Sequence, residues 1–126
     1  MPAVYPGEGK KVLYLSFDDG PHPGATPFAL ETLKAFNAKA TFFCLGKNVR
    51  DHPHIYQQIL QDGHSVGNHS FNHLNGWRCS TPEYIEDIQK ARTLIDSPLF
   101  RPPYGRMRQK QQAALLSVMP GTRIVM

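Results

Sequence analysis

Long apolar runs are missing from the 126-residue sequence, and none approaches the length of a membrane span. A helix that crosses a bilayer needs about 18 or more mainly apolar residues. The first residues, 1–6, also lack the charged segment followed by an apolar segment that marks a secretory signal peptide. We therefore expect neither a membrane span nor a signal peptide in this chain.

Cysteine is scarce, with only Cys44 and Cys79, and the two do not have the close spacing of a metal-binding or redox pair. They are too few for a disulfide framework, and Cys44 stands in an apolar run, as a small core residue would. The hydrophobic fraction of 40% and the charged fraction of 19% are those of a globular protein. Residues 1–126 are therefore interpreted as one domain.

Charge is modest too, with a formal net charge of +4. Most basic residues are scattered, and one local cluster contains Arg101, Arg106, Arg108 and Lys110. The cluster has no interleaved aromatic residues and no known nucleic-acid-binding motif. A solvated surface is expected there, and nucleic acid is not predicted as a partner.

Strand-like and helix-like segments alternate along the chain. Strands are predicted over residues 12–17, 39–45, 64–69, 99–101 and 122–126. Helices are predicted over residues 27–37, 53–62, 81–95 and 109–118. This order indicates an α/β fold of about five βα units, with a parallel sheet and right-handed crossovers. No helix follows the last strand to cover it, so we expect the domain to be incomplete at its C-terminal end.

Two adjacent carboxylates, Asp18 and Asp19, directly follow the first predicted strand, which we expect to be buried. The carboxyl ends of parallel strands carry the active sites of α/β folds. Neighbouring carboxylates repel each other, so a cation or a basic partner is expected nearby. By itself, the segment fits an ordinary turn equally well, because Gly20 and Pro21 follow.

Two histidines, His69 and His73, stand four residues apart after the third predicted strand. That spacing would place both imidazoles on one face of a helical turn, where they can bind one metal ion. Asp19 or Asp18 would then be the third ligand. Taken alone, the pair is more often two surface histidines.

The segment Arg101 to Gly105 follows the fourth predicted strand and contains two prolines. A Pro-Pro turn is rigid and supplies no backbone donor of its own. It would fix the direction of the Arg101 guanidinium and expose the backbone N–H of Tyr104. By itself, it is more typical of a structural loop in which the arginine caps carbonyl groups.

Together and in this order, the three segments are far more specific than any one of them. The sequence resembles the polysaccharide deacetylases of the NodB-homology type, which form carbohydrate esterase family 4. Residues 16–21, 69–73 and 101–105 resemble that family's first three motifs. Residues 40–43 and 63–68 also resemble the segments that lie between those motifs.

This resemblance implies a deformed (β/α) barrel that removes N- or O-linked acetyl groups from polysaccharides of the chitin, peptidoglycan or xylan type. It implies a divalent metal, most often zinc with cobalt as an alternative, held by Asp19, His69 and His73. Asp18 is then the general base and pairs with Arg101. By resemblance, the backbone N–H of Tyr104 helps to hold the oxyanion. Family members mostly act outside the cytoplasm, in the cell envelope or beyond.

The sequence departs from the family at its C-terminus, since no histidine follows His73. The family's fourth and fifth motifs, with the general acid, would lie beyond Met126. We therefore expect a truncated chain that binds metal but is weakly active or inactive. An exposed sheet edge would also favour self-association.

Two other functions fit part of the pattern. Two histidines and one carboxylate also form the metal site of non-haem Fe(II) oxygenases, but here the aspartate comes first and the pattern is βα. A carbohydrate-binding homologue without catalysis would need only aromatic residues such as Trp77 or Tyr104. The intact Asp18 argues against long-standing loss of catalysis.

Overall fold

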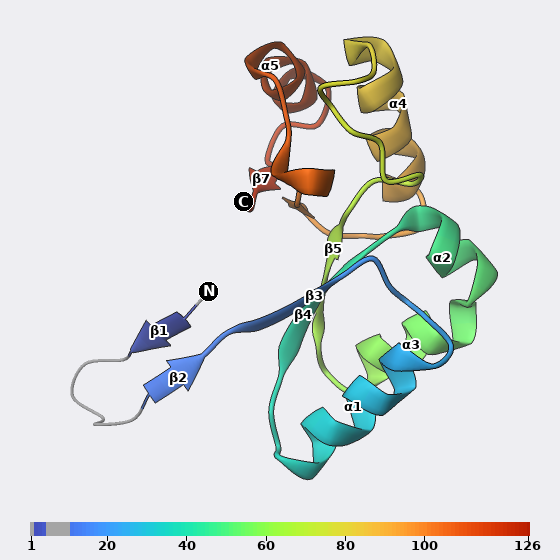
Figure 1. The fold of residues 1–126 in the computed structure, drawn as a ribbon, viewed down its shortest axis with the longest axis vertical. Coiled ribbons are helices and arrows are strands. Elements are labelled where there is room, and N and C mark those ends of the chain that lie inside the picture. Colours follow the sequence, from blue (N-terminus) through green and yellow to red (C-terminus); the bar gives the residue numbers. More distant parts are fainter. Residues whose placement is uncertain (1, 5–10) are drawn as a thin grey trace.

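The computed structural model describes residues 2–4 and 11–126, and side chains from Tyr14 onward (Figure 1). Its strands are β1 (Pro2–Val4), β2 (Lys11–Leu13), β3 (Leu15–Asp18), β4 (Ala40–Cys44), β5 (Ser65–Asn68), β6 (Leu99–Phe100) and β7 (Arg123–Ile124). Its helices are α1 (Ala25–Ala35), α2 (Gly46–Asp51), α3 (Pro53–Gln61), α4 (Thr81–Arg92) and α5 (Gln109–Val118), with a 3₁₀ turn over Pro103–Gly105.

Five strands form one parallel sheet in the order β3-β4-β5-β6-β7, which is also their order in the chain. Right-handed crossovers between sequential parallel strands place all the connecting helices on one face. Figure 1 shows these helices following one another along one side of the sheet. The predicted α/β alternation is thus confirmed, and the carboxyl ends of the strands lie at a common edge.

Two hydrophobic clusters hold the helices on the sheet. The first joins Leu30 and Leu33 of α1 to Phe42 of β4 and Ile59 of α3. The second contains Tyr84 and Ile88 of α4, Phe100 of β6 and Leu115 of α5. Full burial of each such side chain stabilises the fold by about 1.5–3 kcal/mol. Both clusters lie on the helix-covered side, which leaves the strand ends free to carry polar groups.

Local sequence signals predicted several helix ends well. Ser80 and Glu83 form the expected capping box at the start of α4, where the N–H of Glu83 donates to Ser80 Oγ. Pro53 begins α3, as predicted from its preference for the first helical turn. The helix α1 begins at Ala25 with Gly24 as its cap, two residues before the predicted start, and Thr26 Oγ accepts the N–H of His22 in the preceding loop.

The prediction of a buried first strand over residues 12–17 is wrong. One strand, β2, ends at Leu13 and pairs antiparallel with β1, and β3 begins at Leu15. In β3, Leu15 is 41% exposed and Phe17 is 38% exposed. The reason is its place in the sheet: among the described strands, β3 pairs only with β4 and forms an edge.

A further helix, α2, lies between β4 and α3, where no element was predicted. Its first residue, Gly46, packs so closely that a Cβ there would lie 2.5 Å from the ring of Phe71. The helix N-terminus therefore sits directly beside the loop that follows β5. None of the helices within residues 11–126 is long and apolar enough to cross a membrane.

Candidate metal centre

A cavity of about 510 Å³ opens at the carboxyl ends of β3, β5 and β6. All six residues that the sequence singled out line this cavity: Asp18, Asp19, His69, His73, Arg101 and Tyr104. Pro102, Gly105 and Met126 complete its lining. Parallel strands in register bring these segments together, because each one directly follows its strand.

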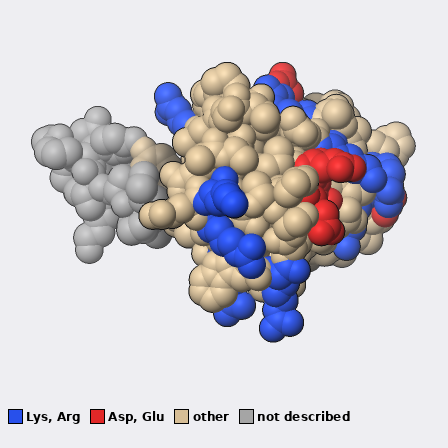
Figure 2. Space-filling view, turned by 90° about the horizontal axis from the view of Figure 1, so that it is seen from above, with Lys and Arg blue, Asp and Glu red and all other residues tan. Residues whose placement is uncertain are grey.

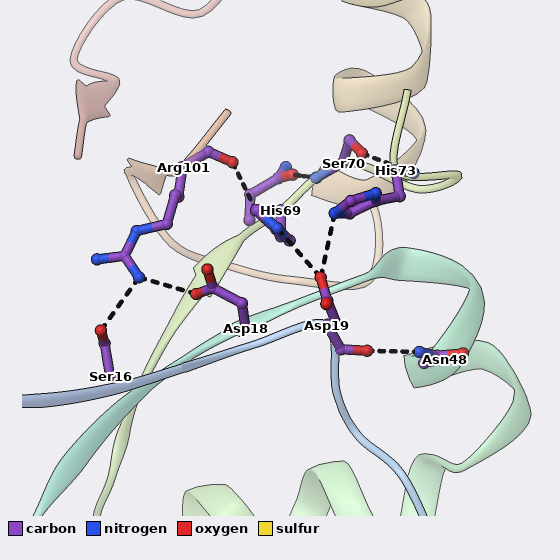
Figure 3. A network of polar contacts seen from close by, with 9 residues as sticks. Ser16, Asp18, Asp19, Asn48, His69, Ser70, His73 and Arg101 are labelled. Carbon is purple, nitrogen blue, oxygen red and sulfur yellow. Dashed lines mark hydrogen bonds and ion pairs between the residues drawn. The ribbon is translucent and has the colours of Figure 1, made fainter. Parts of the chain in front are cut away.

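Asp19, His69 and His73 form a cluster whose three potential ligand atoms lie within 4.8 Å of one another (Figure 3). Asp19 Oδ1 lies 3.3 Å from His69 Nε2 and 3.2 Å from His73 Nε2. Asp19 has a left-handed backbone, with φ of 73°. Its N–H donates to the carbonyl of Phe43, and its own carbonyl accepts from Asn48 Nδ2 at 2.6 Å. These two bonds hold the carboxylate toward the imidazoles.

The tautomer of His69 follows from its neighbour. Its Nδ1 lies 2.7 Å from the carbonyl oxygen of Arg101, and a carbonyl can only accept, so Nδ1 carries the proton. Burial lowers the pKa of His69, although the bond to the Arg101 carbonyl opposes this shift. In the neutral ring, the Nε2 lone pair therefore faces the Asp19 carboxylate. An acceptor facing an acceptor calls for a cation between them, so these residues fit a metal ion.

The helical turn predicted for residues 69–73 is not formed. Ser70 and His73 have left-handed backbones, with φ of 68° and 58°. Their loop is held by side chains, because Asp87 Oδ2 accepts the N–H groups of Phe71 and Asn72, and Ser70 Oγ accepts that of His73. A loop satisfied in this way has no need of helical hydrogen bonds.

Asp87 is a functional residue that the sequence analysis missed. It lies on α4, is only 6% exposed, and binds the loop through three hydrogen bonds of 2.7–3.0 Å. One signal could have revealed it. Asp87 stands among the buried positions of that helix, next to Ile88, and a carboxylate there needs partners from elsewhere.

Asp18 and Arg101 form the predicted ion pair, with 2.8 Å between Asp18 Oδ1 and Arg101 Nη1 (Figure 3). The same Nη1 donates to Ser16 Oγ at 3.1 Å. The guanidinium lies over the ring of Phe43, 4.1 Å from its centre. This packing directs the guanidinium at one carboxylate oxygen and leaves Asp18 Oδ2 outside the pair.

Tyr104 also lines the cavity and lies in the 3₁₀ turn that follows Arg101. Its φ is 61°, and its ring packs edge-on against His73, with 4.6 Å between ring centres. The turn's hydrogen bonds use the N–H groups of Gly105 and Arg106. The N–H of Tyr104 is outside both bonds, as the Pro-Pro sequence predicted.

Known proteins are similar to this chain in sequence and fold. The family model described as polysaccharide deacetylase matches residues 6–118. A peptidoglycan-N-acetylglucosamine deacetylase from Bacillus cereus is 38% identical over 101 residues, which cover 76% of this chain and 47% of that protein.

Solved structures agree. The Bc1960 peptidoglycan N-acetylglucosamine deacetylase superposes with a TM-score of 0.84 at 35% identity, covering 89% of this chain and 54% of that one. A family 4 carbohydrate esterase from Streptomyces lividans, in complex with acetate, gives 0.81 at 26% identity, with 90% and 60% covered. The chain thus spans about half the length of these relatives. Their likeness confirms the NodB-type α/β fold class, and the chain belongs to the polysaccharide deacetylase family.

Proposed function

We propose that this chain carries the metal site and the general base of a hydrolase that removes acetyl groups from an N-acetylated glycan. One observation supports this most strongly. The Asp19, His69 and His73 cluster and the Asp18 and Arg101 pair line one cavity, as water activation beside a metal requires.

Asp19 Oδ1, His69 Nε2 and His73 Nε2 would hold a divalent ion, with zinc expected before cobalt. When bound, such an ion supplies Lewis acidity toward water and toward the acetamide carbonyl. The ligand set is preorganised, since His69 is oriented by the Arg101 carbonyl and His73 by the loop that Asp87 holds.

Asp18 is proposed as the general base. Arg101 keeps Asp18 Oδ1 occupied and orients the carboxylate, so Oδ2 is the oxygen that takes the proton of the attacking water. The N–H of Tyr104 would donate to the oxyanion that forms on the acetyl carbon. One such donor is worth about 3–4 kcal/mol in other hydrolases.

Departure of the sugar amine needs a proton. His69 and His73 are the imidazoles that line the cavity in the described part of the chain, and each has Nε2 directed at Asp19. The proton would then return from Asp18 or come from a group outside these residues. We therefore expect slow acetate release from the 126-residue chain.

The relatives' names point to peptidoglycan as the proposed substrate, which would place the activity in the cell envelope, outside the cytoplasm. We also expect the edge of β3 to favour self-association at high concentration. Sedimentation of the chain at increasing concentration tests that expectation.

The test of the proposed function combines metal content and acetate release. The dialysed chain should hold about one zinc, and Asp19→Ala and His73→Ala should lose it. His54→Ala, at an exposed position on α3, is the matched control and should keep it. Asp18→Asn should keep zinc and lose acetate release from N-acetylglucosamine oligomers. A folded chain without zinc, or an Asp18→Asn variant as fast as the parent, would contradict the proposal.

A further inference from the structure

Two loops beside the cavity are locked together by one buried side chain. Gln111 of α5 is fully buried, and its Nε2 donates to the carbonyl of Gly76 at 2.6 Å. Its Oε1 accepts the N–H of Arg108 at 2.8 Å. Gly76 allows this approach, since a Cβ there would lie 2.7 Å from the carbonyl oxygen of Arg106. The loop after β5 and the loop after β6 therefore form one rigid unit.

This unit presents Trp77 and Arg106 to solvent. Trp77 is 55% exposed, and the Arg106 guanidinium lies 4.6 Å from the centre of the Trp77 ring. The backbone of Trp77 is held at both ends, because its N–H donates to Asn75 Oδ1 and its carbonyl accepts from Arg108 Nη2 at 2.6 Å. An exposed aromatic ring held this firmly loses little entropy when it binds a ligand.

The two side chains come from loops that also carry residues of the proposed active site, and Trp77 follows His73 by four residues. Arg106 directly follows Gly105, which lines the cavity with Tyr104, and the Tyr104 ring packs on His73. A glycan with one sugar in the cavity would therefore extend a neighbouring sugar across Trp77. No step of the proposed reaction uses either Trp77 or Arg106.

Basic side chains predominate around this unit, and Glu83 at the start of α4 is an exposed acidic neighbour. Arg78, Arg106, Arg108 and Lys110 are all exposed. In Figure 2, seen from the α4 and α5 end, several basic groups lie on this face, and most of the acidic groups lie toward one side of it, next to further basic groups. Such a surface attracts an anionic ligand and repels a cationic one.

We infer that Trp77 and Arg106 form a glycan-binding platform that selects acidic glycans, in which the sugar next to the reacting one carries a carboxylate. The sugar ring would pack on the exposed part of the indole, and the guanidinium would bind the carboxylate through charge-assisted hydrogen bonds. The inference rests on the proposed function, because it names the substrate class of that same site.

The test uses Trp77 as its own reporter, since it is the only tryptophan in the chain. Its fluorescence is followed during titration with two tetrasaccharides of equal length. One is a neutral N-acetylglucosamine oligomer, and the other alternates N-acetylglucosamine with N-acetylmuramic acid, which bears a carboxylate. We expect the acidic tetrasaccharide to bind about tenfold more tightly at low salt, and its advantage to shrink at high salt.

Variants separate stacking from charge. Trp77→Ala, measured by calorimetry, should weaken both tetrasaccharides by about tenfold. Arg106→Gln should bring the acidic one down to the affinity of the neutral one, and Arg106→Lys should restore part of the difference. Lys34→Gln removes an exposed charge on α1 as the matched control and should change neither affinity.

Equal affinities for the two glycans, or no fluorescence response to either at millimolar concentration, would overturn the inference. So would an Arg106→Gln variant that loses both glycans equally, since that result indicates only a packing role. Asp19→Ala distinguishes the two proposals. It should lose metal and acetate release, whereas the response of Trp77 to the acidic glycan should persist.

Discussion

His69 Nδ1 lies 2.7 Å from the carbonyl oxygen of Arg101, so the second and third chemical segments of the chain are joined by a direct hydrogen bond. Backbone bonds set the position of both residues. The N–H of His69 donates to the carbonyl of Cys44, and the N–H of Arg101 donates to that of Asn68. The sheet ladder thus continues past the strand ends and fixes which imidazole nitrogen faces Asp19.

We expect Arg101 to act as a positioning residue whose planar shape matters as well as its charge. Arg101→Lys should lower acetate release by about 10–100-fold, because an ammonium group cannot both stack on Phe43 and hold Asp18 from the same direction. Zinc content should not change. The control is Arg92→Lys, which alters the exposed ion pair between Arg92 at the end of α4 and Asp96 beyond it. Equal loss of activity in both variants would show that the guanidinium has no special role.

Asp87 should affect both stability and metal binding, although it does not reach the metal cluster. Asp87→Ala removes the acceptor of three loop hydrogen bonds and leaves two backbone donors unpaired, which should destabilise the fold by about 2–4 kcal/mol. Zinc affinity should fall by about 10–100-fold because His73 loses its support. Denaturant unfolding and zinc titration measure the two effects. Glu86→Ala, the exposed neighbour, should leave both nearly unchanged.

Gly67 lies under the packed ring of Phe43. A Cβ at this position would be 2.5 Å from that ring, so Gly67→Ala should destabilise the chain by about 1–3 kcal/mol and displace the Arg101 guanidinium that rests on the ring. Gly24→Ala is a matched control, since no atom lies within 4 Å of its Cβ position and its φ is −93°. A thermal melt compares the two. If both melt at the same temperature, the close packing at Gly67 is not limiting.

His64 should make the stability of the fold depend on pH. Burial lowers its pKa, nearby Lys39 lowers it further, and Asp62 partly opposes the shift. The neutral ring accepts the N–H of Ala40 at 3.1 Å. Because the folded-state pKa is the lower one, this contribution is complete above about pH 6.5 and is lost as the pH falls below that value.

The measurement is denaturant unfolding of the parent and of His64→Gln between pH 7.5 and pH 5.5. Glutamine keeps an acceptor for Ala40 but does not titrate, so the parent should lose more stability than the variant on acidification. Other titrating groups are common to both chains and cancel in the comparison. Parallel pH profiles would rule out His64 as the cause.

Local chemistry explains why several helix starts could be predicted from the sequence. Pro53 and the capping box of Ser80 and Glu83 act within a few residues of a helix start, so their effect does not depend on distant partners. The exposure of the first strand could not be predicted from local sequence in this way. Its apolar pattern is that of a buried strand, but exposure depends on the number of neighbours in the sheet, and β3 has one among the described strands.

The six candidate site residues were singled out by their types and their places after the strands, and the family resemblance implied their roles. Their geometry required the tertiary structure. A spacing of four residues favours a helical turn, but Asp87 supplies the hydrogen bonds of a left-handed loop from a different element. The contact of Arg106 with Trp77 likewise joins loops far apart in the chain. Sequence by itself determined which groups are present and where several of the helices begin, whereas tertiary packing decided the direction of each group, since its partners lie on other elements.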